Sequence, residues 1–239
     1  MLSPMNQQEY AIIVAGGRGT RIPSVLPKQF IDLQGRPILM HTLDAFYRYS
    51  NNIRIVLVLP EDDFDTWEVL CSQYDYKRPY QLQKGGDTRF QSVRNGLELI
   101  DGDGLVAIHD GVRPLVSEDI IAASFRLAAV HKSAVAAVRL KESIRITDQD
   151  TTRAADRSKF RLIQTPQTFD VALIKEAYQT REEPSLTDDA SVAEKAGHTI
   201  SLFEGSYENI KITTPEDLII AEALICEREY KQKSQQKPA

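Results

Sequence analysis

The chain contains 239 residues, of which 42% are hydrophobic and 26% are charged, and its formal net charge at pH 7 is -5. This length fits one large α/β domain with a generous core, and the acidic balance argues against general nucleic-acid binding. The sequence has no apolar run of about 18 residues that would suit a membrane span, and its first residues lack the pattern of a secretory signal, so we expect a soluble, cytoplasmic protein.

Short runs rich in β-branched residues alternate with amphipathic helical stretches along the chain. The expected strands are 10–15, 53–59, 80–83, 105–109, 134–140 and 199–204, and the expected helices are 36–49, 88–100, 117–131, 187–196 and 215–229. Apolar strands flanked by helices indicate a Rossmann-like α/β fold, a mostly parallel twisted sheet with helices on both faces. We expect a single domain over 1–239 with a disordered tail at about 230–239, and ligands beyond the carboxyl ends of the strands.

One segment departs from this alternation. Residues 136–147 give two strand-like runs with a charged break, and a polar stretch follows to Lys159. This pattern predicts a protruding β-arm at about 137–160. An extended hairpin with little core of its own needs packing, and the same arm of a second chain in a two-fold dimer can supply it. An ordinary surface hairpin agrees equally well with the residues.

The first strand runs directly into a glycine-rich turn that carries basic side chains, Ala15-Gly-Gly-Arg-Gly-Thr-Arg21, and Pro27-Lys-Gln29 follows. Glycines let backbone N–H groups approach an anion, and arginine and lysine add positive charge, so the turn predicts a cradle for nucleotide phosphates. The P-loop and dinucleotide-binding spacings both fail here. A tight turn with solvated arginines is the alternative. The candidate residues are Ala15, Gly16, Gly17, Arg18, Gly19, Arg21 and Lys28.

A second glycine motif, Gly85-Gly-Asp-Thr-Arg89, follows the strand at 80–83 and opens a helix that contains Ser92. Its glycines allow close approach to a base or ribose, and fixed donors and acceptors nearby suit base recognition. A helix N-cap at Asp87 or Thr88 is compatible with the same residues. Gly86, Asp87 and Ser92 are therefore candidates for binding a nucleoside.

Asp110 ends an apolar strand, three residues before Arg113. A carboxylate in this position is a hard oxygen ligand that suits Mg²⁺, although strand-end aspartates more often form turns. Lys211 lies between Ile210 and Ile212, just before a helix, so its side chain should project away from theirs and can meet a phosphate.

Three further motifs, 156–159, 164–167 and 186–190, follow the arm. Taken alone, each is compatible with a turn or a helix cap.

Taken together and in this order, the motifs resemble those of the 2-C-methyl-D-erythritol 4-phosphate cytidylyltransferases of the non-mevalonate isoprenoid pathway. The resemblance runs from about 10 to 225. It rests on the two glycine motifs with Pro27-Lys-Gln, His109-Asp-Gly-Val-Arg-Pro, Thr165-Pro-Gln, Thr187-Asp-Asp-Ala and Asn209-Ile-Lys-Ile-Thr. It implies a nucleotidyltransferase that transfers CMP from CTP to 2-C-methyl-D-erythritol 4-phosphate and releases pyrophosphate.

The resemblance also implies roles for individual residues. Arg21, Lys28 and Lys211 would be the catalytic cations at the phosphates. Ala15 to Gly19, with Gly86, Asp87 and Ser92, would bind the nucleotide, and Asp110 would hold Mg²⁺. The sugar-phosphate site would contain Asp110, Arg113, Ser143, Arg157 and Thr165. Members of the family are homodimers whose arms exchange, so Arg157 would serve the partner's site. No nucleic-acid or membrane partner is implied.

Two departures from the family pattern leave alternatives open. Gly111 and Val112 stand where the family often has two alanines, and Ser143 stands where it often has threonine. Valine at the position of Val112 also occurs in ribitol 5-phosphate cytidylyltransferases, so that substrate, or another sugar phosphate, is the alternative. A non-catalytic nucleotide-binding domain is the third, although Lys28 and Asp110 are both retained.

Overall fold

The computed structural model describes residues 7–17 and 26–235 of the chain. Within these residues the strands are β1 (Glu9–Val14), β2 (Asp32–Leu33), β3 (Arg36–Pro37), β4 (Arg54–Leu59), β5 (Gln81–Lys84), β6 (Leu105–Asp110), β7 (Ser133–Arg139), β8 (Ile144–Asp148), β9 (Thr151–Ala155), β10 (Arg161–Asp170) and β11 (Leu202–Glu204). The α-helices are α1 (Ile38–Tyr49), α2 (Phe64–Gln73), α3 (Arg89–Glu98), α4 (Glu118–His131), α5 (Val171–Ala177), α6 (Asp189–Lys195) and α7 (Pro215–Gln235). Short 3₁₀ turns lie at η2 (Lys28–Phe30), η3 (Glu61–Asp63) and η4 (Arg157–Lys159).

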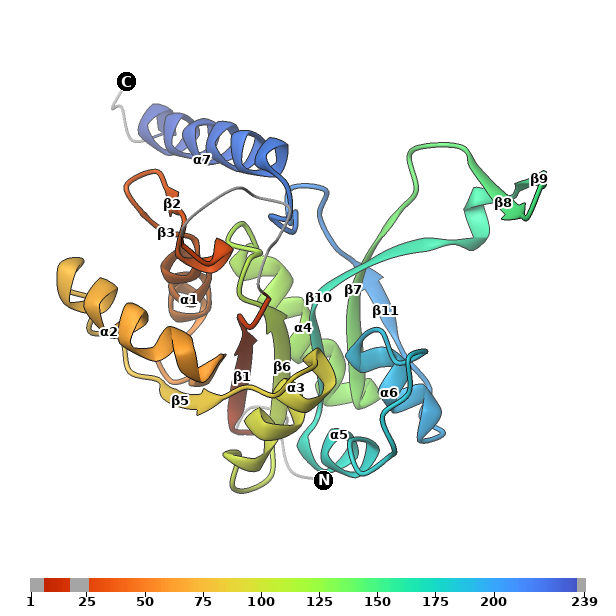
Figure 1. Cartoon of the computed structure of the whole chain (residues 1–239), viewed down its shortest axis with the longest axis horizontal. Helices are drawn as coiled ribbons and strands as arrows, with labels where there is room; N and C mark the ends of the chain where they lie inside the picture. Colours follow the sequence, from red (N-terminus) through yellow and green to blue (C-terminus); the bar gives the residue numbers. More distant parts are fainter. Residues whose placement is uncertain (1–6, 18–25, 236–239) are drawn as a thin grey trace.

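A seven-stranded sheet with the order β11-β7-β10-β6-β1-β4-β5 forms the centre of the molecule (Figure 1). Strand β1 pairs in parallel with β4 and β6, β4 with β5, and β7 with β11. Strand β10 alone is antiparallel, to both β6 and β7. The predicted mostly parallel sheet is therefore confirmed, and the carboxyl ends of β1, β4, β5 and β6 lie at one edge.

Both faces of the sheet are covered, which explains the apolar runs 10–14 in β1, 55–59 in β4 and 105–108 in β6. In β1, Ile13 packs into a core formed with α1, α2 and α4, whereas Ile12 packs into a second core formed with α3, α5 and α6. Successive side chains of a strand point to opposite faces, so covering both faces favours hydrophobic residues at consecutive positions. This packing fixes the strand ends from which the loops of the candidate site emerge.

Strand β10 is the main element that the sequence pattern does not predict. Gln164-Thr-Pro-Gln167, compatible with a turn on its own, lies inside β10, where the register with β7 shifts between Ile163 and Gln167. Proline and buried amides are tolerated there because distant groups supply their partners: Gln164 Nε2 donates to the Ser206 carbonyl and Gln167 Oε1 accepts from the Ala190 N–H. Helices α2 and α5 were also not predicted, and α7 continues past its predicted end at Glu229.

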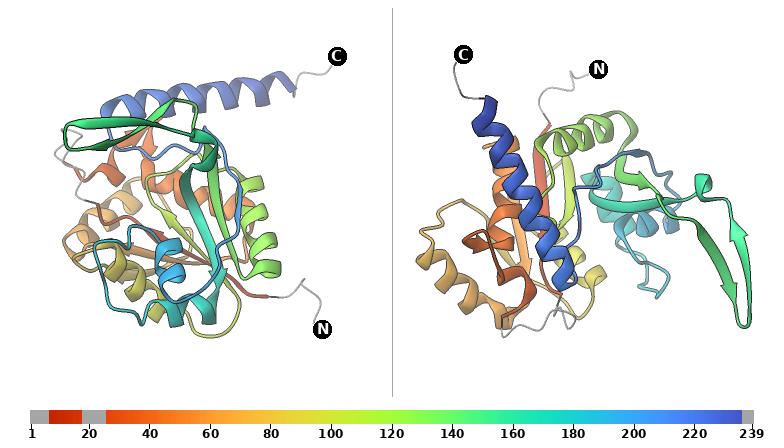
Figure 2. Two further views of the ribbon diagram at one scale, coloured as in Figure 1. Left: turned by 90° about the vertical axis from the view of Figure 1, so that its right-hand side faces the viewer. Right: turned by 90° about the horizontal axis from the view of Figure 1, so that it is seen from above.

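Strands β8 and β9 form a separate two-stranded antiparallel sheet. This hairpin projects from the body beyond β7 and β10, away from the helices, as two further views show (Figure 2). Most of its side chains are exposed, and so are Phe160 and Leu162 at its base. The predicted segment at 137–160 thus contains a protruding hairpin, which leaves apolar side chains uncovered in the single chain.

Helix α7 lies over a third, smaller core, formed by Leu33, Ile38, Val112, Leu115, Ile212 and Ala221. This core joins the segment before α7 to the loop after β6, and the Ile212 N–H donates to the Val112 carbonyl at 2.9 Å. No helix in the described ranges 7–17 and 26–235 has the length and apolar character needed to cross a bilayer.

The central position of β1 gives a test of this packing. We expect Ile12→Ala to lower the free energy of unfolding by about 2 to 5 kcal/mol, because Ile12 is fully buried and its loss leaves a cavity. Ile219→Ala is the matched control: Ile219 is 67% exposed on α7 and its truncation should change the free energy by less than about 0.5 kcal/mol. Urea denaturation measures both, and equal effects would contradict the assignment of the core.

Candidate active site at the carboxyl edge of the sheet

The first glycine turn and Lys28 lie together. The Ala15 N–H donates to the Val58 carbonyl at 2.9 Å, which ties the start of the turn to β4. A Cβ atom on Gly17 would lie 3.1 Å from both Cε and Nζ of Lys28, so the ammonium group lies directly against the glycine backbone. Glycine at this position is what permits that approach. Arg18, Gly19 and Arg21 lie outside the described residues, and their roles at the phosphates stay predictions.

The second glycine motif is next to the first. The Gly85 N–H donates to the Leu59 carbonyl at 2.8 Å, and the Gly86 N–H donates to Ser92 Oγ at 3.1 Å. Ser92 Oγ in turn donates to the Thr88 carbonyl at 2.9 Å, and it lies 3.9 Å from the position of a Cβ on Gly16. Thr88 caps α3, as one of the two predicted caps.

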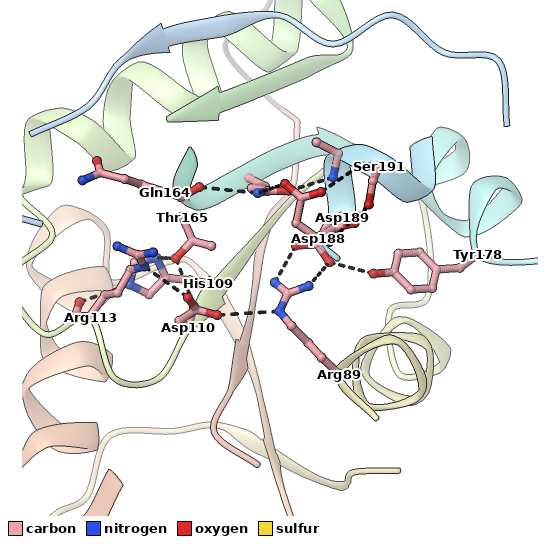
Figure 3. A network of polar contacts seen from close by, with 12 residues as sticks. Arg89, His109, Asp110, Arg113, Gln164, Thr165, Tyr178, Asp188, Asp189 and Ser191 are labelled. Carbon is pink, nitrogen blue, oxygen red and sulfur yellow. Dashed lines mark hydrogen bonds and ion pairs between the residues drawn. The ribbon is translucent and has the colours of Figure 1, made fainter. Parts of the chain in front are cut away.

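Asp110 ends β6 and is the centre of an ion-pair cluster (Figure 3). Its Oδ2 atom lies 3.1 Å from Arg113 Nε and 3.1 Å from Lys211 Nζ, and its Oδ1 atom lies 3.7 Å from Arg89 Nε. Burial alone would raise the pKa of this carboxyl group, which is 6% exposed, but the three cations outweigh burial and hold the pKa well below its usual range. Asp110 is therefore a carboxylate at neutral pH.

A chain of hydrogen bonds fixes the backbone of Asp110. His109 Nε2 faces the Arg113 carbonyl at 3.2 Å, which can only accept, so Nε2 must carry the proton. His109 Nδ1 is then an acceptor, and Thr165 Oγ1 donates to it at 3.0 Å while accepting from the Asp110 N–H at 3.1 Å. Thr165 lies on β10, so its hydroxyl group joins the antiparallel strand to the end of β6.

Lys211 reaches the cluster because its neighbours are held on both sides. Asn209 Nδ2 donates to the Thr165 carbonyl at 2.8 Å, and the Asn209 carbonyl accepts from Arg113 Nη1 at 2.8 Å. On the other side, Ile212 is fully buried in the third core. Lys211 thus lies beside Asp110, and its predicted contact with a nucleotide phosphate stays a prediction.

Sequence reasoning missed Arg89 and Asp189 as a pair. Arg89 donates from Nη1 and Nη2 to the two carboxylate oxygens of Asp189, at 2.8 and 2.7 Å, and Tyr178 donates to the same carboxylate at 2.6 Å. A signal was present, because arginine in the first turn of a helix opposes the helix dipole and needs an acidic partner. The partner is 100 positions away in the chain, and no spacing rule identifies it.

Two predicted residues are not brought to this cluster. Ser143 and Arg157 are exposed and lie on the hairpin segment, where the Arg157 guanidinium donates to the Lys141 carbonyl. The hairpin leaves the sheet after the carboxyl end of β7 and projects beyond the body of the molecule (Figure 1).

The first departure from the family pattern, Gly111 and Val112, has a packing reason at each residue. A Cβ atom on Gly111 would lie 2.7 Å from Ala15 Cβ and 3.1 Å from Leu39 Cδ1, so this backbone approaches the first glycine turn too closely for a larger residue. Val112 is 4% exposed and belongs to the third core.

Asp110 is the one carboxylate in contact with Arg113 and Lys211 among the described residues. Among the described residues, no group of three or more histidine, cysteine or acidic side chains is gathered in a way that could hold a metal ion. Mg²⁺ is commonly held by one or two carboxylates together with substrate phosphates and water. Asp110 Oδ1, which has a cation only at 3.7 Å, fits as the single protein ligand of such an ion.

The buried imidazole gives a pH-dependent test. Burial lowers the pKa of His109 to about 4, compared with about 6.5 in an unfolded chain. The unfolded state therefore binds more protons between these values, and the stability contributed by neutral His109 is lost as the pH falls through that window. We expect the wild type to lose more unfolding free energy than His109→Gln between about pH 6.5 and 4.5, by up to about 1.4 kcal/mol per pH unit. Denaturant titrations at each pH measure the free energy of unfolding. Equal losses in the wild type and in His109→Gln would contradict a buried, neutral His109.

Comparison with known proteins agrees with the order of these motifs. The sequence model of the 2-C-methyl-D-erythritol 4-phosphate cytidylyltransferase family matches residues 10–227 of this chain. Curated proteins of that name are 46% identical over 215 residues in Bacteroides fragilis (90% of this chain, 98% of the relative) and 48% identical over 223 residues in Porphyromonas gingivalis (92% and 99%).

Solved structures show the same fold. The 4-diphosphocytidyl-2C-methyl-D-erythritol synthase of Anaerococcus prevotii superimposes with a TM-score of 0.78 at 32% identity, covering 92% of this chain and 96% of that one. The 2-C-methyl-D-erythritol 4-phosphate cytidylyltransferase of Francisella tularensis gives a TM-score of 0.75 at 31% identity (90% and 99%). The chain belongs to the 2-C-methyl-D-erythritol 4-phosphate cytidylyltransferase family.

Proposed function

We propose that this protein transfers CMP from CTP to 2-C-methyl-D-erythritol 4-phosphate, giving 4-diphosphocytidyl-2-C-methyl-D-erythritol and pyrophosphate, a step in the biosynthesis of isoprenoid precursors. The observation that carries the proposal is the convergence of Arg113 and Lys211 on Asp110, in a chain that matches the family from residue 10 to 227. Cations held at one point by a carboxylate suit a reaction between two anions.

The chemistry needs alignment and charge neutralisation rather than a covalent intermediate. A phosphate oxygen of the sugar phosphate attacks the α-phosphorus of CTP, the bond from that phosphorus to the bridging oxygen breaks, and pyrophosphate leaves with the bonding electrons. Lys28 and Arg21 meet the triphosphate, while Lys211 meets the attacking phosphate and keeps it in line. Arg113 offers its second Nη group to the sugar phosphate.

The nucleoside binds along the two glycine motifs. Gly16, Gly17 and Gly86 present backbone without side chains, and Ser92 Oγ keeps one lone pair after its contacts with Gly86 and Thr88. An amino group of cytosine is a donor that such an acceptor recognises. Ala15 and Asp87 flank the same space.

Asp110 would be the residue that holds Mg²⁺, and the ion would supply neutralisation of charge on the triphosphate. Because three cations surround Asp110, a dication would be repelled there unless the phosphates of a nucleotide offset that charge.

The sugar alcohol lies beside Thr165 and the partner's arm. The Thr165 hydroxyl group already donates to His109, so it can only accept, and it therefore suits a hydroxyl group of the substrate rather than its phosphate. The exposed Ser143 and Arg157 reach the site of a second copy in a homodimer, whose arms cover the apolar side chains at the base of the hairpin. We place this dimer in the cytoplasm, without nucleic-acid or membrane partners.

Pyrophosphate release tests the function directly. With CTP, Mg²⁺ and methylerythritol 4-phosphate, we expect one pyrophosphate per sugar phosphate consumed, and none when the sugar phosphate is omitted. Ribitol 5-phosphate and sugar 1-phosphates with UTP complete the panel, because all are anions that the same cations can attract. Preferential turnover of any of these, or no turnover at all, would overturn the proposal.

Mixed dimers test the sharing of the arm. Lys28→Ala should lower kcat by about 10²- to 10³-fold, because it removes one preorganised cation from developing charge. Arg157→Ala should raise the KM for the sugar phosphate. A dimer with one subunit of each kind contains one site that lacks both changes, so it should regain activity above either homodimer. Arg153→Ala, which changes an exposed arginine on β9 of the same arm, serves as the control. If the mixed dimer is no more active than the Lys28→Ala and Arg157→Ala homodimers, each complete site lies within a single chain.

A further inference from the structure

The pair Arg89 and Asp189 lies one step away from the proposed magnesium ligand. Asp189 is fully buried, and its carboxylate grips both terminal nitrogens of the Arg89 fork while also accepting from Tyr178 (Figure 3). Burial, followed by the charge of Asp189, raises the pKa of Tyr178 well above its ordinary value, so that hydroxyl group remains a donor. The guanidinium orientation is therefore fixed from the side opposite Asp110.

This grip decides which nitrogen faces Asp110. With Nη1 and Nη2 committed to Asp189, only Nε points toward Asp110 Oδ1, and it stays at 3.7 Å, beyond hydrogen-bond length. The other oxygen of Asp110 is in closer contact with its cations, at 3.1 Å from Arg113 and from Lys211. The two oxygens are thus unequal: Oδ2 has two cations at 3.1 Å, whereas Oδ1 has a cation only at 3.7 Å.

Charge explains why Arg89 needs this restraint. Arg89 begins α3, where the helix dipole opposes a cation, and the nearest carboxylates are those of Asp110 and Asp189. An arginine released from Asp189 would pair bidentately with Asp110, the favoured geometry for a guanidinium and a carboxylate. Such a pair would cover Oδ1.

We propose that Asp189 is a positioning residue that holds the Arg89 guanidinium away from Asp110 and so keeps Asp110 Oδ1 open for the divalent cation of the metal–nucleotide complex. This inference rests on the proposed function. Asp189 acts only through Arg89, so removing the arginine as well should cancel the effect of removing the acid.

The experiment measures binding of Mn²⁺, an EPR-visible substitute for Mg²⁺, in the presence of the non-reactive analogue α,β-methylene-CTP. We expect Asp189→Asn to weaken Mn²⁺ binding by about tenfold or more, the usual scale for loss of a group that orients a metal ligand. The double variant Asp189→Asn/Arg89→Met has no buried charge in this pair and should bind Mn²⁺ as the wild type does. Circular dichroism and thermal melting monitor the fold of each variant.

Asp188→Asn is the matched control. This variant changes an aspartate to asparagine one residue earlier, at the N-cap of α6. The Asp188 carboxylate accepts hydrogen bonds from Gln167 Nε2 and from the Ser191 N–H, whereas Arg89 pairs with Asp189. Its Mn²⁺ affinity should equal that of the wild type. The inference is overturned if Asp189→Asn binds Mn²⁺ with wild-type affinity. It is also overturned if the double variant binds Mn²⁺ as weakly as Asp189→Asn does. If Asp189→Asn alone does not fold, the Mn²⁺ affinity of the double variant still decides between the two outcomes. If the wild type itself shows no nucleotide-dependent Mn²⁺ binding, the proposed function fails together with the inference.

Discussion

One buried carboxylate organises the candidate site. Asp110 sits at the end of β6 with three cations around it, each from a different part of the chain: Arg89 from the start of α3, Arg113 from the loop after β6, and Lys211 from the segment before α7. Three cations at this separation would repel one another without it. Desolvating a carboxylate is costly unless opposite charges and hydrogen bonds compensate, so the cluster forms only when these segments are in place together.

The antiparallel strand β10 is what makes that assembly specific. Its Thr165 contacts the backbone of Asp110 through the hydroxyl group and Asn209 through the carbonyl, so one residue links β6 to the segment that carries Lys211. Gln167 of the same strand contacts Asp188 and Ala190 at the start of α6, next to the partner of Arg89. The polar stretch of β10 therefore holds the segments of the site together through hydrogen bonds, whereas apolar packing holds the rest of the fold together.

The sequence predicts those elements whose structure is determined by residues close to them in the chain. Strands β1, β4 and β6 are predictable because burial on both faces gives each of them a continuous apolar run, and the direction of Lys211 is predictable because isoleucines flank it. Strand β10 is not, because its proline and glutamines are satisfied only by groups such as Ser206, far along the chain. Arg89 and Asp189 are missed for the same reason: an arginine in the first turn of a helix signals an acidic partner but not which one, and only the folded chain brings the two within 2.8 Å.

Lys211 and Arg113 keep N–H donors that are not used by Asp110. The cations of the ion-pair network can therefore also bind an anion. A lysine ammonium group has three donors, and contact with one carboxylate oxygen leaves two for a phosphate. Arg113 commits Nε to Asp110 and Nη1 to the Asn209 carbonyl, which leaves Nη2. Asp110 and Asn209 thus orient these side chains before any ligand arrives, so little side-chain entropy remains to be lost on binding. In a chain with a net negative charge, such preorganisation concentrates positive potential at one edge of the sheet, where the chemistry of two anions requires it.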